Sequence, residues 1–392
     1  MPTLEWIGKS KVINHHQDVP FRVLERKYSF DENGQHDEDN GSENMIIRGD
    51  NLEALKALLP RYEGRVKCIY IDPPYNTGNE GWVYNDNVND PKIKKWLGEV
   101  VGKEGEDLTR HDKWLCMMYP RLKLLQKLLH PTDGSIFISI DENEIQNLKL
   151  ICNEIFGSNH HVATIAWQKR YSRENRGAIG DAHEYILVYA SDVETFKVIR
   201  HKVEFDENSA KVYKNPNNDP KGRWRAVPMT AQGYRPNQMY PITTPSGKVC
   251  YPPQGRCWST VESEYKKLLE AGRIYFGKNG DSQPSTIRYL SEVEGMIPWT
   301  WWPHEEVGHT DEAKKEIITI LGNADSFDTP KPTRLIKRIL QIATNPDDII
   351  LDSFAGSGTT AHAVLNMNKA DGGHRKFILV EMMDYADSIT AE

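Results

Sequence analysis

Residues 66–78 read VKCIYIDPPYNTG, an apolar run that ends at Asp72 and continues into two prolines and a tyrosine. The run is short and rich in β-branched and aromatic residues, which predicts a buried strand over 66–71. Ligands of open α/β sheets bind at the carboxyl ends of strands, where Asp72-Pro73-Pro74-Tyr75 falls. The prolines stiffen the loop and withhold N–H donors, Asp72 offers a carboxylate acceptor, and Tyr75 offers a face for stacking. An Asx-type turn with a packed tyrosine is the structural alternative to a site.

A second loop stands in DIILDSFAGSGTT (348–360), between a predicted strand and a predicted helix. Gly356 and Gly358 allow a ligand to approach the backbone closely, and this context is typical of a nucleotide-cofactor loop. The loop is not a full G-x-G-x-x-G and lacks the lysine of a P-loop, which argues against dinucleotides and nucleoside triphosphates. Glu381 closes the next predicted strand, where an acid can hold ribose hydroxyls.

Between and around these loops, strands and helices alternate, which predicts a doubly wound, mostly parallel α/β sheet. Asp141 and Glu144 have the spacing of an N-cap signature for a helix through Ile155. Residues 196–325 change character, because Pro, Asn, Gly and Trp are frequent and only ESEYKKLLEAG is clearly helical. The predicted domains are therefore 1–44 (extension and acidic linker), 45–195 (catalytic part), 196–325 (insertion) and 326–392 (cofactor part). The final DYADSITAE resembles the first turns of a helix, which suggests a C-terminal truncation.

Bulk properties narrow the function classes without deciding among them. No apolar run of about 18 residues exists, and five cysteines in 392 residues do not form a disulfide framework, so we expect a cytoplasmic protein with reduced thiols. Cys250 and Cys257 lack zinc spacing, and no metal is predicted. The formal charge of −7 owes much to acids within 31–44, whereas 168–177 and 221–226 are basic. These two segments are either solvated faces or nucleic-acid contacts, with Lys169, Arg170, Arg173, Arg176, Arg223, Trp224 and Arg225 as candidates. Trp299, Trp301 and Trp302 are further candidates, or core residues.

Asp72-Pro-Pro-Tyr75 resembles the catalytic motif of amino-group DNA methyltransferases, and Phe354-Ala-Gly-Ser-Gly358 resembles their S-adenosylmethionine motif. The catalytic motif comes first and an insertion separates the two, an order that resembles the beta class with its circularly permuted, Rossmann-like fold. DPPYNTGNEGWVYND, WLCMMYPRL, DGSIFISIDENE and HEYILVYA are similar to modification (Mod) subunits of type III restriction–modification systems. The resemblance covers 45–195 and 326–392 well, and the insertion only in position and character.

The resemblance implies S-adenosyl-L-methionine as cofactor, with Asp352 anchoring the glycine loop and Glu381 binding the ribose. It places the loop residues Phe354, Ala355, Gly356, Ser357, Gly358 and Thr359 around the methionine and sugar, Asp50 near the adenine, and Lys331, Pro332 and Thr333 near the methionine carboxylate. For Asp50 and Lys331, an N-cap and a surface lysine are alternatives.

The implied reaction is methylation of the N6 amine of a flipped-out adenine, with the amine bonded to Asp72 and the Pro73 carbonyl and its ring on Tyr75. Asp rather than Ser before Pro-Pro-Tyr favours adenine over cytosine N4 in this family. The implied partners are double-stranded DNA, a restriction (Res) subunit and a second copy in a homodimer, with the insertion recognising the target. A methyltransferase acting on RNA or a protein amide and a non-catalytic DNA-binding module are the competing hypotheses.

Overall fold

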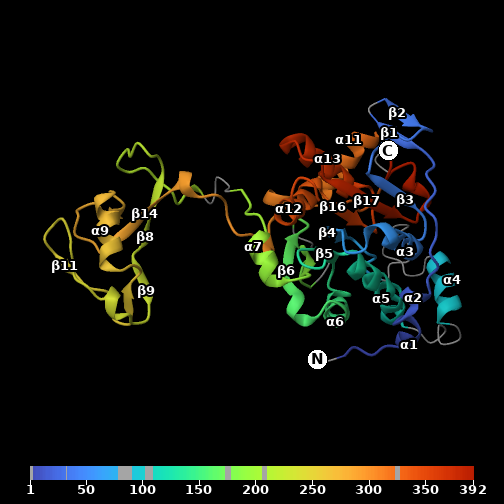
Figure 1. Cartoon of the computed structure of the whole chain (residues 1–392), viewed down its shortest axis with the longest axis horizontal. Coiled ribbons are helices and arrows are strands. Elements are labelled where there is room, and N and C mark those ends of the chain that lie inside the picture. Colours follow the sequence, from blue (N-terminus) through green and yellow to red (C-terminus); the bar gives the residue numbers. More distant parts are fainter. Residues whose placement is uncertain are drawn as a thin grey trace. The chain divides into compact units, whose positions relative to one another are not determined.

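Residues 3–31, 33–77, 91–101, 109–172, 178–204, 210–322 and 327–392 are described by the structure, a computed structural model. The chain forms two units, one of Met1–His201 with Pro298–Glu392 and one of Lys202–Ile297. Figure 1 shows the sheet strands and their flanking helices in the first of these units.

An eight-stranded sheet organises the larger unit in the order β15-β6-β7-β5-β4-β16-β17-β3. The strands are β3 (Met45–Arg48), β4 (Cys68–Ile71), β5 (Ser135–Ile140), β6 (His161–Gln168), β7 (His183–Ala190), β15 (Trp301–Trp302), β16 (Ile349–Asp352) and β17 (Lys376–Glu381). Only β7 runs antiparallel to its neighbours, so the mostly parallel α/β fold is confirmed. The late strands β16 and β17 insert between β4 and β3, which completes one sheet from two distant parts of the chain.

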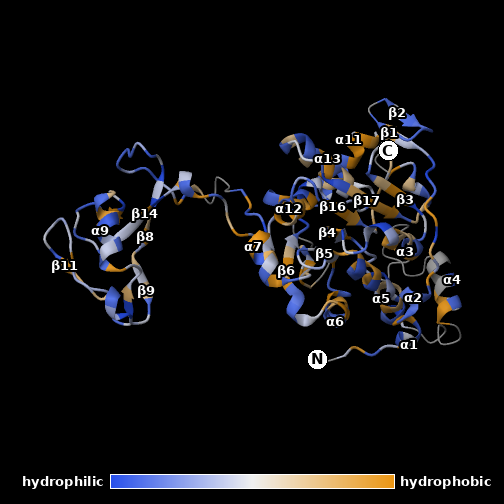
Figure 2. Ribbon diagram, in the orientation of Figure 1, coloured by the Kyte–Doolittle hydropathy of each residue, from blue (hydrophilic) through white to orange (hydrophobic). Residues whose placement is uncertain are grey.

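Amphipathic helices cover this sheet. The first group is α3 (Asn51–Tyr62), α5 (Arg110–Leu128) and α6 (Ile145–Ile155), and the second is α12 (Thr333–Ala343) and α13 (Thr359–Asp371). Within each group the helices pack against one another. Leucines of α3 and α5 form one core with isoleucines of β4 and β5, and Figure 2 shows hydrophobic colour along the strands of this sheet. The other helices of this unit's described residues are α1 (Lys9–Val12), α2 (His15–Asp18), α4 (Pro91–Val100), α7 (Val193–Ile199), α10 (His304–Val307) and α11 (Thr310–Leu321).

Three local predictions are wrong. The helix α6 is N-capped by Glu144 rather than Asp141, because Asp141 instead accepts the backbone N–H of Asn143 in a turn. The region 196–325 contains a second clear helix, α11, which ends at Gly322 in the left-handed conformation. The final residues form a 3-10 turn (Asp384–Ala386) and further turns instead of an α-helix, since the N–H groups of Ile389 and Thr390 converge on the Tyr385 carbonyl.

The smaller unit, Lys202–Ile297, covers fewer residues than the predicted insertion 196–325. Its described residues, 202–204 and 210–297, contain short antiparallel sheets and the α-helix α9 (Glu262–Glu270). The strands are β8 (Trp224–Pro228), β9 (Thr230–Gln232), β10 (Ile242–Thr243), β11 (Val249–Cys250), β12 (Arg256–Trp258), β13 (Ile274–Tyr275) and β14 (Ser285–Tyr289). Its core is aromatic, with Tyr240, Trp258, Tyr265 and Phe276 buried together.

The first 44 residues add a small hairpin of β1 (Ser29–Asp31) and β2 (Gly34–His36). Among the described residues, no helix is both long enough and apolar enough to cross a membrane.

Candidate active site

Four strand ends converge where the two predicted loops meet. Ile350 and Leu351 of β16 pair in parallel register with Cys68 and Ile69 of β4, so Asp352 and Asp72 emerge at the same edge of the sheet. On the other side of β16, β17 ends at Glu381 and β3 ends just before Asp50. The structure therefore brings together the loops that the sequence places about 280 positions apart.

Asp72 lies at the centre of a compact polar network. Its Oδ2 accepts a hydrogen bond from Lys331 Nζ at 2.6 Å, and its Oδ1 accepts one from the Tyr75 hydroxyl at 2.9 Å. The Lys331 ammonium also lies over the Tyr75 ring, 5.0 Å from its centroid. Lys331 thus neutralises Asp72 and contacts the same two groups that were predicted to hold a target base. A surface lysine, the alternative for Lys331, is excluded because its side chain is only 11% exposed.

A second carboxylate, Glu184 of β7, faces the same tyrosine. The Tyr75 hydroxyl is 3.0 Å from Glu184 Oε2, and Lys331 Nζ is 3.8 Å from the same carboxylate. Lys169 Nζ completes the network at 3.2 Å from Glu184 Oε1 and 2.8 Å from Asp181. Two carboxylates therefore flank the Tyr75 hydroxyl, and each of them is paired with an ammonium group, Asp72 with Lys331 and Glu184 with Lys169.

Burial strongly affects the ionisation of this network. Burial raises the pKa of Asp72, Lys331 opposes that rise, and the nearby charge of Glu184 adds to it. Burial also raises the pKa of Tyr75 well above its usual value, and the charge of Asp72 raises it further. Tyr75 is therefore a neutral hydroxyl at physiological pH, able both to donate and to accept a hydrogen bond.

The Asp72 loop is held from behind by buried hydrogen bonds. Trp114 of α5 donates its indole N–H to the Pro74 carbonyl at 2.6 Å. Asn76 follows with φ of 61°, a left-handed conformation that asparagine tolerates better than most residues, and donates to Glu144. Glu144 is fully buried and also bonds His111 Nδ1 at 2.6 Å and Asn147 Nδ2 at 2.8 Å. This arrangement fixes the direction in which Asp72 and Tyr75 project.

The glycine loop after β16 is anchored by the side chain of Asp352. Its two oxygens accept from the Phe354 N–H at 3.0 Å and from the Thr360 hydroxyl at 2.6 Å, and burial raises its pKa to about 7. Gly356 and Gly358 have φ of 53° and 78°, so both adopt the conformation that glycine permits. The loop then leads into α13, with Gly358 as its N-cap residue.

Glu381 reaches back from β17 to the same loop. Its carboxylate accepts the Gly356 N–H at 2.9 Å and the Met383 N–H at 3.0 Å, and burial raises its pKa. Asp50 is the N-cap residue of α3, because its side chain accepts hydrogen bonds from the N–H groups of Leu52 and Glu53. This is the N-cap role that was the alternative to a cofactor contact for Asp50.

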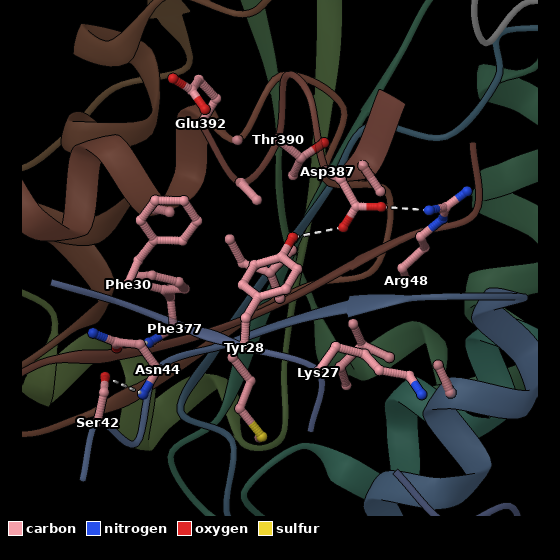
Figure 3. A pocket seen from close by; sticks show the side chains of 18 of the residues that line it. Lys27, Tyr28, Phe30, Ser42, Asn44, Arg48, Phe377, Asp387, Thr390 and Glu392 are labelled. Carbon is pink, nitrogen blue, oxygen red and sulfur yellow. Dashed lines mark hydrogen bonds and ion pairs between the residues drawn. The ribbon is translucent and has the colours of Figure 1, made fainter. Parts of the chain in front are cut away.

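A pocket of about 1680 Å³ opens beside this loop, and Asp50, Lys331, Thr333, Ser357, Gly358 and Thr359 line it. Pro332, Asp352, Ala355 and Glu381 are buried and Phe354 is half-buried, and these five residues are not part of the pocket lining. Figure 3 shows Tyr28 and Phe30 of the N-terminal segment in the pocket wall, with Tyr28 donating to Asp387 of the C-terminal segment. Of the twelve predicted cofactor residues, six therefore line the cavity, and the other six, Gly356 among them, do not.

The predicted DNA contacts are scattered. Lys169 belongs to the Glu184 network, Arg170 is exposed, and Arg173 and Arg176 lie outside the described residues. In the smaller unit Arg223 and Arg225 are half-buried and flank Trp224, which packs in the core against Tyr275. The tryptophans of 299–302 belong to the larger unit, where Trp302 is buried and Trp299 and Trp301 are exposed. In the described residues no group of three metal-ligating side chains occurs.

The sequence reasoning missed Glu184 and Glu144 as members of the site. Both occur in segments that had been singled out as motifs, HEYILVYA and DGSIFISIDENE, but each reads there as a solvated charge or a cap. Asn51 was also missed. Its side chain bonds the Ser353 carbonyl at 3.2 Å and accepts from the buried Arg121, which links α3 to the glycine loop.

Comparisons with protein families and with curated proteins agree on the kind of protein to which this chain is similar. A family model described as DNA methylase matches residues 66–392. The Mod subunit of the type III restriction–modification enzyme StyLTI from Salmonella typhimurium is 40% identical over 359 residues, which cover 87% of this chain and 53% of that protein. The EcoPI Mod subunit of Escherichia phage P1 is 34% identical over 424 residues, 97% of this chain and 63% of that protein.

A third relative has a length closer to that of this chain. The type II methyltransferase M1.MboII from Moraxella bovis is 61% identical over 301 residues, which cover 76% of this chain and 78% of that protein. By contrast, the chain spans between about half and two thirds of the Mod subunits it matches. The family match extends from β4 through the glycine loop to the last residue, and it includes every strand end of the site except that of β3. This chain therefore belongs to the N6/N4 DNA methylase family.

Proposed function

We propose that this chain transfers the methyl group of S-adenosylmethionine to the N6 amine of an adenine flipped out of DNA. The observation that carries the proposal is the meeting of the Asp72-Pro73-Pro74-Tyr75 loop with the Asp352–Gly358 loop at the switch point of the sheet. Catalysis at this site needs no protein nucleophile, since S-adenosylmethionine supplies an activated methyl group on a sulfonium. The protein then has to bind the cofactor and the target base, to orient them, and to accept one proton from the amine.

The residues around the pocket fit this cofactor. Gly356 and Gly358 present backbone without side chains, and Glu381 stands at the end of β17, where an acid can hold ribose hydroxyls. Lys331 is the cation on the pocket wall next to Asp72 and suits the methionine carboxylate. The cavity of about 1680 Å³ exceeds the ~300–1,000 Å³ of ordinary ligand pockets. The room suits a nucleoside cofactor beside the glycine loop.

The catalytic loop suits an amine attached to a planar ring. Asp72 accepts hydrogen bonds at both oxygens in this structure, and a carboxylate has about four lone-pair sites, so it retains capacity for an amine. Bonding of the amine to Asp72 and to the Pro73 carbonyl favours a tetrahedral nitrogen with an available lone pair. Stacking on Tyr75 requires Lys331 to move from the ring face that it covers here. Alignment at near-attack distance then lowers the barrier.

The smaller unit has the charge expected of the target-recognition module that we propose. Residues 202–297 contain 14 Lys and Arg against 10 Asp and Glu, a formal charge of +4, whereas the whole chain carries −7. A cationic surface favours association with phosphates, and base-edge contacts then specify sequence. Because relatives of this chain are named as Mod subunits, we further propose that it functions in a restriction–modification system, with a restriction subunit and a second copy as partners.

The test is transfer of labelled methyl from S-adenosylmethionine to unmethylated genomic DNA, followed by digestion to nucleosides and mass spectrometry. N6-methyladenine is expected, and Asp72→Ala should abolish it while the cofactor still raises the melting temperature. N4-methylcytosine would overturn the base assignment and keep the reaction. Absence of any methylated base, with no thermal shift by the cofactor, would refute the proposed function.

A further inference from the structure

The Tyr75 hydroxyl lies between two carboxylates, and this arrangement indicates where a proton released in the reaction can go. Asp72 Oδ1 lies 2.9 Å and Glu184 Oε2 lies 3.0 Å from the same hydroxyl. A hydroxyl has one proton to donate and two lone pairs to accept with. It can therefore serve both carboxylates fully only when one of them is protonated and donates to it. The geometry is that of a proton path from one carboxyl through the tyrosine to the other.

Methylation of an exocyclic amine creates the need for such a path. When the N–CH3 bond forms and the sulfonium C–S bond breaks, the nitrogen holds two hydrogens and a positive charge. One N–H bond must then break, and Asp72 is the acceptor to which we have assigned the amine. An Asp72 that kept this proton could not accept the next amine, so the proton must leave.

We propose, resting on the proposed function, that Glu184 takes up this proton through the Tyr75 hydroxyl. The N–H bond of the methylated amine breaks and an O–H bond forms on Asp72. Asp72 then donates to the Tyr75 oxygen as the tyrosine gives its own proton to Glu184, which restores the phenol and leaves Asp72 ionised. Glu184 acts through Tyr75, and it is a positioning residue that stores the proton and does not touch the substrate.

Charged and polar groups surround Glu184 on the side of the Tyr75 hydroxyl away from Asp72. Lys169 and Lys331 face it at 3.2 and 3.8 Å, Tyr75 and Asp72 face it from the catalytic loop, and Asp181 shares Lys169. The side chain of Glu184 is 12% exposed, whereas that of Asp181 is 39% exposed.

The test is a double-mutant cycle on single-turnover methyl transfer, with enzyme in excess over sites in unmethylated genomic DNA. Glu184→Gln keeps the shape and removes the proton acceptor, and Tyr75→Phe keeps the ring and removes the bridge. Each should slow transfer by about 100-fold, in the range of general acid–base catalysis. Because both lie on one path, the double variant should be no slower than the slower single variant. Losses that multiply would overturn the inference.

Two further readouts separate this role from a purely structural one. The charge of Glu184 helps to raise the pKa of Asp72, so Glu184→Gln should shift the acid limb of the rate–pH profile to lower pH. Displacement of Tyr75 alone would remove a hydrogen bond that lowers the pKa of Asp72, and would therefore shift that limb to higher pH instead. The thermal shift by S-adenosylmethionine and the affinity for DNA should be unchanged in Glu184→Gln, and loss of either would also overturn the inference.

Glu154→Gln is the matched control, because Glu154 also accepts from a tyrosine hydroxyl, that of Tyr119 at 2.9 Å, and from a lysine, Lys9 at 3.0 Å, but lies on α6 and belongs to neither loop of the site. Its transfer rate should equal that of the wild type. If the wild type is active and Glu184→Gln is equally active, the inference is overturned while the proposed function stands. A wild type that transfers no methyl overturns the proposed function and the inference with it.

Discussion

Replacing Gly358 by alanine tests the close approach at the glycine loop, and Gly372→Ala is its matched control. Both glycines flank α13 and have nearly equal φ, 78° and 72°. An alanine Cβ at Gly372 meets no heavy atom within 4 Å, whereas at Gly358 it lies 2.8 Å from the backbone oxygen of Thr390. The left-handed strain of about 1–2 kcal/mol applies to both variants. The clash applies only to Gly358→Ala.

The difference between the two variants can be worked from the structure. Overpacking a tight site typically costs about 1–3 kcal/mol. If the Thr390 segment moves instead, the bond from the Thr390 hydroxyl to the Gly356 carbonyl, 2.6 Å long, is lost at about 1 kcal/mol. Gly358→Ala should therefore lose at least about 1 kcal/mol more than Gly372→Ala in urea unfolding, together with affinity for S-adenosylmethionine in isothermal titration. Equal losses of stability, with equal cofactor affinity, would refute the reasoning.

Three further outcomes are expected. Burial raises the pKa of Asp352 to about 7, so ionisation of this side chain destabilises the fold as the pH rises from about 4 to 7. In urea unfolding, Asp352→Asn should therefore gain stability relative to the wild type between about pH 5 and pH 8. A difference that stays constant with pH would contradict this. Glu144→Gln turns a buried acceptor into a donor facing the Asn147 amide and should lower the free energy of unfolding by about 1–3 kcal/mol. Arg223→Ala should reduce the slope of log affinity for DNA against log salt by about 1, and an unchanged slope would remove Arg223 from the interface.

The sheet and its two loops were predictable because central parallel strands are buried on both faces and read as continuous apolar runs. CIYI before Asp72 and IIL before Asp352 are such runs, and the rule for strand ends then locates the site. The family relationship predicted from the two motifs is confirmed. The assignment of each residue to the cofactor or to DNA stays a prediction.

Glu184 could not be found from local pattern, because its partners Tyr75 and Lys331 lie 109 and 147 positions away and nothing in HEYILVYA marks the charge as buried. Strand β15 was missed because it has only two residues, Trp301 and Trp302, which are too few to show the alternation of apolar and polar residues that marks a strand. The helix α11 was missed although its signals were present. TDEAKKEIITIL has acids in its first turn and a glycine, Gly322, directly after its end.

The position of β16 and β17 between β4 and β3 has a consequence for how the chain folds. During synthesis β3, β4 and β5 emerge early, but β4 has no partner on its β16 edge until residues 349–352 have left the ribosome. Pairings of such long sequence separation are slow to form, and an unpaired apolar edge is prone to aggregate. The smaller unit, whose strands pair within 96 consecutive residues, can fold before the sheet closes. Expression at lower temperature or with chaperones should therefore raise the soluble yield more than stabilising the smaller unit does.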